Sequence, residues 1–302
     1  MSVLQRLPEN ARVAVIRLRS LGDCVLTTPA LALLKDARPD LEVAVAVEPR
    51  FAAVFEDSPA VSRVLNPSPG AMFQFRPHLC LNLHGGTRSL WITAASAAGL
   101  RAGFAHHKGS WLYNHPIPRA QQILGVERTV HTAEHLASAV FHLGAPRSEV
   151  PRAILYAQPQ AALRPYAIIH PVAATLQKTW SADGFRQVAR HLEKEHALEA
   201  VFIAGPGEDL AAFAGFRTIV GAPLRQTKSL LKSASFFVGN DSGPAHMAAA
   251  FGVPVVALFG PSDPVVWAPW RTPHEVLANG ASISRITAHE VIAAVDRVKV
   301  SA

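Results

Sequence analysis

The segment Gly239 to His246 reads G-N-D-S-G-P-A-H and lies between an apolar run and a run of small residues. A strand that ends in a polar turn and opens a helix directs backbone N–H groups and the helix dipole at one spot. Asp241 offers an acceptor for a ribose or sugar hydroxyl, and Gly243 lets a ligand approach the backbone. The pattern predicts an anion site, with a simple N-cap at Asp241 or Ser242 as the alternative.

A second junction of this kind lies near the start of the chain. Asp23 follows the apolar run Val13–Ile16 and precedes the helical run Val25–Lys35, in which Pro29 is tolerable only near the helix start. Open α/β sheets place catalytic groups at such a turn, outside the carboxyl ends of the strands. Asp23 is therefore a candidate catalytic carboxylate, and helix capping is again the alternative.

One further turn carries groups that suit phosphate, and another lies at the same sheet edge. Thr175 offers a hydroxyl and Lys178 a compact cation in the loop after the apolar strand Tyr166–His170. The alternative for Lys178 is an ordinary solvated loop lysine. Asp263 lies in the turn G-P-S-D-P, where it could be purely structural.

Strand-like and helix-like runs alternate along the whole chain, and the strands are continuously apolar. This pattern is typical of parallel sheets covered on both faces and predicts an α/β protein of two doubly wound, Rossmann-like domains. The proline-rich segment Gly144–Pro165 reads as the connection between them. We expect domains over 1–155 and 156–302, with ligands in the cleft that they face and the last helix a candidate to pack back on the first domain. The expected strands are Val13–Arg17, Glu42–Val47, Ser62–Leu65, Leu79–Leu83, Tyr166–His170, Ala200–Ala204, Thr218–Val220, Phe236–Gly239 and Val255–Phe259.

Composition excludes several classes of protein. The 302 residues are 49% hydrophobic and 17% charged, with no apolar run of membrane-spanning length and no signal-peptide pattern, so a cytoplasmic location is expected. The two cysteines, Cys24 and Cys80, form no metal or disulfide motif. The sequence lacks the glycine fingerprints of dinucleotide and P-loop sites and the HExxH motif, so no metal or cofactor is expected. It also lacks the G-x-S-x-G elbow of the usual hydrolases.

The net charge of +7 is unevenly distributed. No acidic residue occurs between Asp57 and Glu127, whereas six basic residues do. The alternatives are a solvated surface and a face for an anionic partner. A phosphorylated or carboxylated substrate, or an anionic membrane surface, suits these dispersed charges better than nucleic acid does.

Taken together, four motifs resemble those of the ADP-heptose–lipopolysaccharide heptosyltransferases, which are glycosyltransferase family nine and have a GT-B fold. The resemblance runs over nearly the whole chain. It rests on Arg17–Leu31 (R-L-R-S-L-G-D-C-V-L-T-T-P-A-L), Ala173–Trp180 (A-A-T-L-Q-K-T-W), Gly239–His246 and Phe259–Pro264 (F-G-P-S-D-P). It implies inverting transfer of a heptose or related sugar from an ADP-sugar donor to an anionic lipopolysaccharide core.

The resemblance also implies roles for single residues. Asp23 is then the general base that deprotonates the acceptor hydroxyl. The donor-binding positions are Thr175, Lys178, Asp241, Ser242, Gly243 and His246. Positive charge and the helix N-terminus can stabilise the departing diphosphate without a metal.

On the acceptor side, the basic residues of the acid-free interval would attract anionic lipopolysaccharide and the inner face of the cytoplasmic membrane. The candidates are Arg63, Arg88, Arg101 and Lys108. Two other functions remain open: a GT-B nucleotide-sugar epimerase or hydrolase, and a non-catalytic protein that binds a nucleotide sugar.

Overall fold

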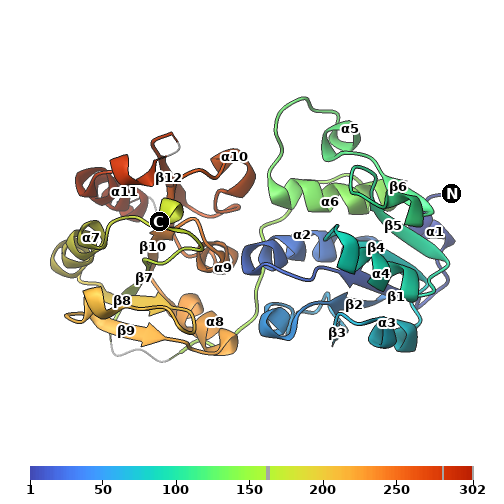
Figure 1. Ribbon diagram of the computed structural model, residues 1–302, viewed down its shortest axis with the longest axis horizontal. Coiled ribbons are helices and arrows are strands. Elements are labelled where there is room, and N and C mark those ends of the chain that lie inside the picture. Colours follow the sequence, from blue (N-terminus) through green and yellow to red (C-terminus); the bar gives the residue numbers. More distant parts are fainter. Residues whose placement is uncertain (161–163, 281, 301–302) are drawn as a thin grey trace. The chain divides into compact units, whose positions relative to one another are not determined.

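A six-stranded parallel sheet forms the framework of the first of two units, Met1–Tyr156 and Ala157–Ala302 (Figure 1). The computed structural model describes residues 1–160, 164–280 and 282–300. The strands of the first unit are β1 (Arg12–Ile16), β2 (Glu42–Ala46), β3 (Arg63–Leu65), β4 (Leu79–Asn82), β5 (Leu100–Phe104) and β6 (His115–Ile117). Their order is β3-β2-β1-β4-β5-β6, with every neighbouring pair parallel.

Helices cover both faces of this sheet. They are α1 (Val3–Arg6), α2 (Leu21–Ala37), η1 (Pro49–Val54), α3 (Pro69–Phe75), α4 (Thr87–Ala95), η2 (Ser110–Leu112), α5 (Ala120–Leu124) and α6 (Thr132–Leu143). Helix α2 packs against α6, and α3 packs against α4. Met72 and Phe75 of α3 and Ile92 of α4 share a buried cluster with Ala14 and Ile16 of β1. The central strand is therefore buried on both sides, which explains its continuous apolar sequence.

The second unit repeats this plan. Its strands are β7 (Tyr166–His170), β8 (Glu199–Ala204), β9 (Arg217–Val220), β10 (Phe236–Asn240), β11 (Val255–Phe259) and β12 (His274–Ala278). Their order is β12-β11-β10-β7-β8-β9, again all parallel. The helices are η3 (Leu176–Lys178), α7 (Ala182–Glu195), η4 (Ala211–Phe213), α8 (Leu224–Ser233), α9 (Gly243–Phe251), α10 (Pro264–Trp267), η5 (Ile283–Arg285) and α11 (Ala288–Val300).

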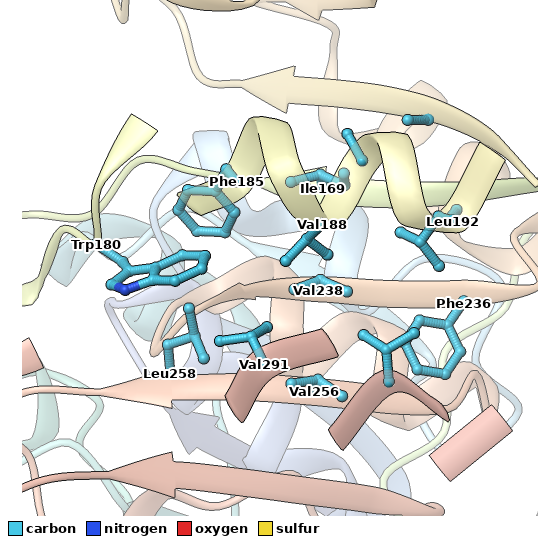
Figure 2. Packing of buried hydrophobic residues seen from close by; sticks show 14 of the residues in the cluster. Ile169, Trp180, Phe185, Val188, Leu192, Phe236, Val238, Val256, Leu258 and Val291 are labelled. Carbon is cyan, nitrogen blue, oxygen red and sulfur yellow. The ribbon is translucent and has the colours of Figure 1, made fainter. Parts of the chain in front are cut away.

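The core of the second unit lies between its sheet and the pair α7 and α11. Phe185, Val188 and Leu192 of α7 pack on the sheet, together with Val291 of α11 (Figure 2). Each such fully buried side chain contributes about 1.5–3 kcal/mol of transfer free energy. The last helix, α11, packs its apolar side chains into the core of this unit.

The doubly wound α/β arrangement is confirmed in both halves, but three strands were not expected. Strand β5 contains a charged and a glycine residue, β6 contains Pro116, and β12 is half-exposed. Strands β6 and β12 are edge strands, where a proline costs no ladder bond and exposure weakens the apolar pattern. The ring of Tyr113 covers Gly103 of β5, and it can do so because a glycine has no side chain there.

Helix α2 begins four residues earlier than expected, so Pro29 lies in its interior rather than near its start. A proline there leaves the carbonyl of Val25 without its usual N–H donor. The hydroxyl of Thr28 donates to that carbonyl at 2.8 Å and replaces the missing bond. The same hydroxyl accepts from the backbone N–H of Ile154 at 3.1 Å, at the end of the first unit.

Candidate active site

Three loops of the second unit lie at one edge of its sheet. They follow β7, β10 and β11, which are neighbouring parallel strands, so their carboxyl ends meet there. The predicted Thr175–Lys178, Asp241–Gly243 and Asp263 segments belong to these three loops. The sequence therefore placed the candidate donor residues correctly at a single sheet edge.

Buried Asn240, the last residue of β10, connects this strand to the loop after β7. Its side-chain amide donates to the carbonyl of Pro171 at 2.8 Å, and its oxygen accepts from the N–H of Trp180 at 3.1 Å. The loop that carries Thr175 and Lys178 is thus held at both ends by one side chain. Sequence reasoning assigned Asn240 no role, although a polar amide ending a buried strand was a usable signal.

Lys178 and Asp241 form an ion pair, with Nζ and Oδ2 3.0 Å apart. The carboxylate is 9% exposed and the lysine side chain 32% exposed. The sequence predicts that Asp241 accepts a hydrogen bond from a ligand hydroxyl. In the structure, its carboxylate accepts from Lys178 and so positions that ammonium group. An ammonium group has three donors, so Lys178 retains donors for a ligand. The solvated-loop alternative for Lys178 is wrong.

Ser242 is the N-cap of α9 by backbone position, but its side chain makes no cap hydrogen bond. Its hydroxyl instead lies 3.1 Å from Nδ1 of His170, at the end of β7. Burial lowers the pKa of His170 to about 4, so this imidazole is neutral at pH 7. Because the Ser242 hydroxyl bonds to His170 and not to a backbone N–H of α9, the interpretation of this hydroxyl as a simple helix cap is wrong.

At the N-terminus of α9, no side chain of the N-cap residue bonds to the backbone N–H groups. Gly243 is the first helical residue and a proline follows it, so the first turn is not covered by a capping side chain. In strand β10, a glycine is required at Gly239, since a Cβ there would lie 2.9 Å from the carbonyl oxygen of His170. His246 is 4% exposed and its ring makes an edge contact with that of Trp267, with centroids 6.4 Å apart and the rings inclined at 63°.

The loop after β11 supports the loop after β7 by close backbone contact. A Cβ on Gly260 would lie 2.6 Å from the carbonyl oxygen of Gln177, beside Lys178. Thr175 is exposed, as is the neighbouring Leu176. Asp263 caps α10 by accepting from the N–H of Val265 at 2.9 Å, so its structural interpretation is confirmed.

In the first unit, Asp23 lies in the first turn of α2 and is not its N-cap, which is Ser20. Its Oδ1 pairs with the guanidinium of Arg17, and its Oδ2 accepts from the Ser20 hydroxyl at 3.0 Å. Arg17 is 7% exposed and also donates to the carbonyl of Leu83. The carboxylate is 20% exposed, so it is oriented by two partners and still reachable. Arg17 was part of the quoted motif but was given no role.

Other groups gather at the same carboxyl edge of the first sheet. His84 follows β4, and burial together with the nearby Arg17 charge lowers its pKa to about 4. Glu48 follows β2 and pairs with Arg50 and with Arg88. The hydrogen bond from Arg50 is the main cause that lowers the pKa of Glu48.

The structure does not bring the four basic acceptor candidates together. Arg88 lies in the first turn of α4 at the carboxyl edge, and exposed Lys108 follows β5 at that edge. Arg63 begins β3 at the opposite edge, where it pairs with a glutamate at 2.9 Å. Arg101 is the second residue of β5 and donates to the carbonyls of Leu112 and Ala98, so its guanidinium is engaged in holding the backbone.

The interval that carries these charges also holds aromatic residues for which both a core and an interfacial position were open. Tyr113 is 5% exposed and belongs to the core, whereas Trp91 and Trp111 are 63% and 81% exposed. No helix among the described residues has the length and apolar character needed to cross a membrane.

Two Rossmann-like units, each with its functional loops at the carboxyl edge of a parallel sheet, define the GT-B class of glycosyltransferase fold. Solved structures have this fold: the glycosyl transferase family 9 protein from Veillonella parvula superposes with a TM-score of 0.84 at 19% identity, covering 97% of this chain and 98% of that one. The E. coli heptosyltransferase WaaC with ADP superposes with a TM-score of 0.80 at 20% identity, covering 95% and 99%.

Sequence comparison then gives the family. Glycosyltransferase family 9 (heptosyltransferase) matches residues 78–287, and the chain belongs to this family. A curated relative, lipopolysaccharide heptosyltransferase 3 of Escherichia coli K12, is 25% identical over 92% of this chain and 95% of its own length. Lipopolysaccharide heptosyltransferase 1 of Salmonella typhimurium is 27% identical over 84% and 89%. The protein is thus a glycosyltransferase, as the motifs predicted.

Proposed function

We propose that this glycosyltransferase transfers a heptose from ADP-heptose to the core of a lipopolysaccharide acceptor, with inversion at the anomeric carbon. Family membership and the lipopolysaccharide heptosyltransferase relatives support the reaction class. The observation that carries the donor assignment is the Lys178–Asp241 ion pair beside the open N-terminus of α9. A fixed cation and a helix dipole at one sheet edge form a site for a diphosphate.

In this mechanism, the acceptor hydroxyl oxygen attacks the anomeric carbon of the heptose. The bond to that carbon forms while the bond from it to the diphosphate oxygen breaks, and ADP leaves with the electron pair. Asp23 takes the hydroxyl proton. The charge that develops on the leaving diphosphate is stabilised by Lys178 and by the backbone N–H groups at the start of α9.

The surroundings of Asp23 suit a base that must stay in place. Arg17 and Ser20 each occupy one side of its carboxylate, and each carboxylate oxygen has a second lone pair. Those remaining lone pairs can receive the proton from the acceptor. The proposal requires that the two units bring Asp23 to a sugar held at the loops of the second unit, by closure that also excludes water.

The same proposal assigns an anionic acceptor to the first unit. Arg88 and Lys108 lie after the carboxyl ends of their strands, at the edge that also carries Asp23. Such charges attract phosphate and carboxylate groups and raise the association rate at low salt. We include contact with the anionic inner face of the cytoplasmic membrane in this proposal, with exposed Trp91 and Trp111 as aromatic anchors.

The test is the change of Asp23 to Asn, assayed for heptose transfer and, separately, for ADP binding. Loss of a general base lowers turnover about 10²–10⁴-fold, while ADP binding stays at the wild-type level. Asp36→Asn is the matched control, because Asp36 is an exposed carboxylate on the same helix. Transfer by Asp23→Asn at more than about a tenth of the wild-type rate would contradict the assignment of the base.

A further inference from the structure

Two histidines and an aspartate converge on the second unit, away from the loops described above. His191 lies on α7, His196 is the C-cap of that helix, and Asp296 lies on α11. Nε2 of each histidine is 2.7 Å from the same oxygen, Oδ1 of Asp296. The imidazole centroids are 5.3 Å apart and the rings are inclined at 69°.

The cluster has the chemistry of a transition-metal site. Each residue offers one ligand atom, and the three atoms lie within 4.8 Å of one another. Two imidazole nitrogens and one carboxylate oxygen are a donor set that suits Zn²⁺ and related divalent ions. One carboxylate oxygen now accepts from both rings, and a metal ion would take the place of the two protons that they share.

The three ligand atoms, which lie within 4.8 Å of one another, must change their separations to admit an ion. Ligand atoms about 2.1 Å from a tetrahedral metal lie about 3.4 Å from one another, so the two 2.7 Å separations must lengthen by several tenths of an ångström. Asp296 can make that movement because its side chain is 47% exposed. The histidines are 18% and 16% exposed, which keeps them in place and leaves a coordination position open to water.

The elements that carry the ligands are rigid. Leu192 of α7 and Val295 of α11 are each fully buried in the core of this unit, one residue from His191 and Asp296. The backbone N–H of His196 donates to the carbonyl of Leu192 at 3.2 Å and fixes the end of α7. The ligands are therefore preorganised by packing, which lowers the cost of binding an ion.

The cluster is separate from the candidate donor site. Helix α7 starts beside the donor loop and runs back to the start of β8, so its last turn lies at the amino edge of the sheet. At about 1.5 Å per residue, His191 is roughly 14 Å along the helix from Ala182. An ion here would join α7 to the last helix and would take no part in sugar transfer.

We propose that His191, His196 and Asp296 form a surface site for one divalent transition-metal ion of the Zn²⁺ class, which links α7 to α11. The inference is independent of the proposed function, since it rests on side chains outside the transfer site. The buried Cys24 and Cys80 belong to the other unit and offer no competing thiolate at this position.

The test uses the full chain without a histidine tag, titrated with ZnCl₂ by calorimetry and followed by thermal unfolding. We expect saturable binding of one ion with a Kd below about 100 µM and a rise in Tm as the ion stabilises the folded state. His191→Gln and His196→Gln each weaken binding at least about tenfold. His289→Gln, an exposed histidine on α11, is the matched control and keeps wild-type affinity.

Two results would overturn the proposal. One is wild-type protein that shows no saturable binding below about 100 µM. The other is binding that both glutamine variants retain at wild-type strength, which would show that the zinc is held elsewhere. In either case the cluster would be only a hydrogen-bonded contact between two helices.

Discussion

Gly260 offers a sharp test of whether the loop that carries Lys178 must hold its position. A Cβ at residue 260 would lie 2.6 Å from the carbonyl oxygen of Gln177, about 0.8 Å short of the 3.4 Å at which ordinary contact begins. The Cβ of Ile283 would also lie in contact with it, at 3.5 Å. The clash is with backbone, so in Gly260→Ala the Gln177 segment itself must move, and Lys178 moves with it.

A displacement of about 1 Å at a positioning group costs up to about 10²-fold in rate, so kcat/KM for the ADP-sugar should fall about 10- to 100-fold. Overpacking of this kind also costs about 1–3 kcal/mol of stability, which urea unfolding measures separately. The matched control is Gly215→Ala, where no atom lies within 4 Å of the new Cβ. A Gly260→Ala enzyme with kcat/KM within about twofold of wild type would refute the reasoning.

Two further predictions concern the same unit. Lys178→Met removes the cation and leaves Asp241 without this partner, so the Kd for ADP measured by calorimetry should rise about 10- to 100-fold. The control Lys232→Met changes an exposed lysine and should leave this Kd unchanged. Equal affinity of the two variants for ADP would contradict the role assigned to Lys178. Burial lowers the pKa of His170 to about 4, below the ordinary value for a histidine. The unfolded chain therefore protonates this imidazole at a higher pH than the folded chain does. As a result, the free energy of unfolding falls as the pH drops below about 6.5. Between pH 7 and pH 5, the free energy of unfolding measured with urea should fall by about 2 kcal/mol because of this group. In His170→Asn this contribution to the pH dependence should disappear. An unchanged pH dependence in the variant would show that His170 does not titrate as its burial implies.

The main elements of the fold could be predicted because parallel strands buried on both faces leave continuous apolar runs. The edge strands could not, since exposure and Pro116 remove that signal. The start of α2 was misjudged for a different reason. Pro29 is read locally as a position near a helix start, and the compensating bond from Thr28 to Val25 is visible only in the folded chain.

The candidate site was predictable where its chemistry is local. Asp23 and Asp241 lie in turns whose spacing relative to a strand and a helix is readable from the sequence. Their partners were less accessible: Lys178 pairs with Asp241 across 63 positions, and Asn240 holds a loop 69 residues away. Such contacts depend on strand order, because β7 and β10 are neighbours in the sheet but not in the chain.

The proposed reaction is tested most directly by the product of one incubation. Purified protein is mixed with ADP-heptose of defined anomeric configuration and a heptose-free lipopolysaccharide acceptor, and the product is analysed by mass spectrometry and NMR. We predict an acceptor that carries one added heptose with inverted anomeric configuration, formed together with ADP and only when acceptor is present. Release of ADP and free heptose without glycosylated acceptor, or a product with retained configuration, would contradict it.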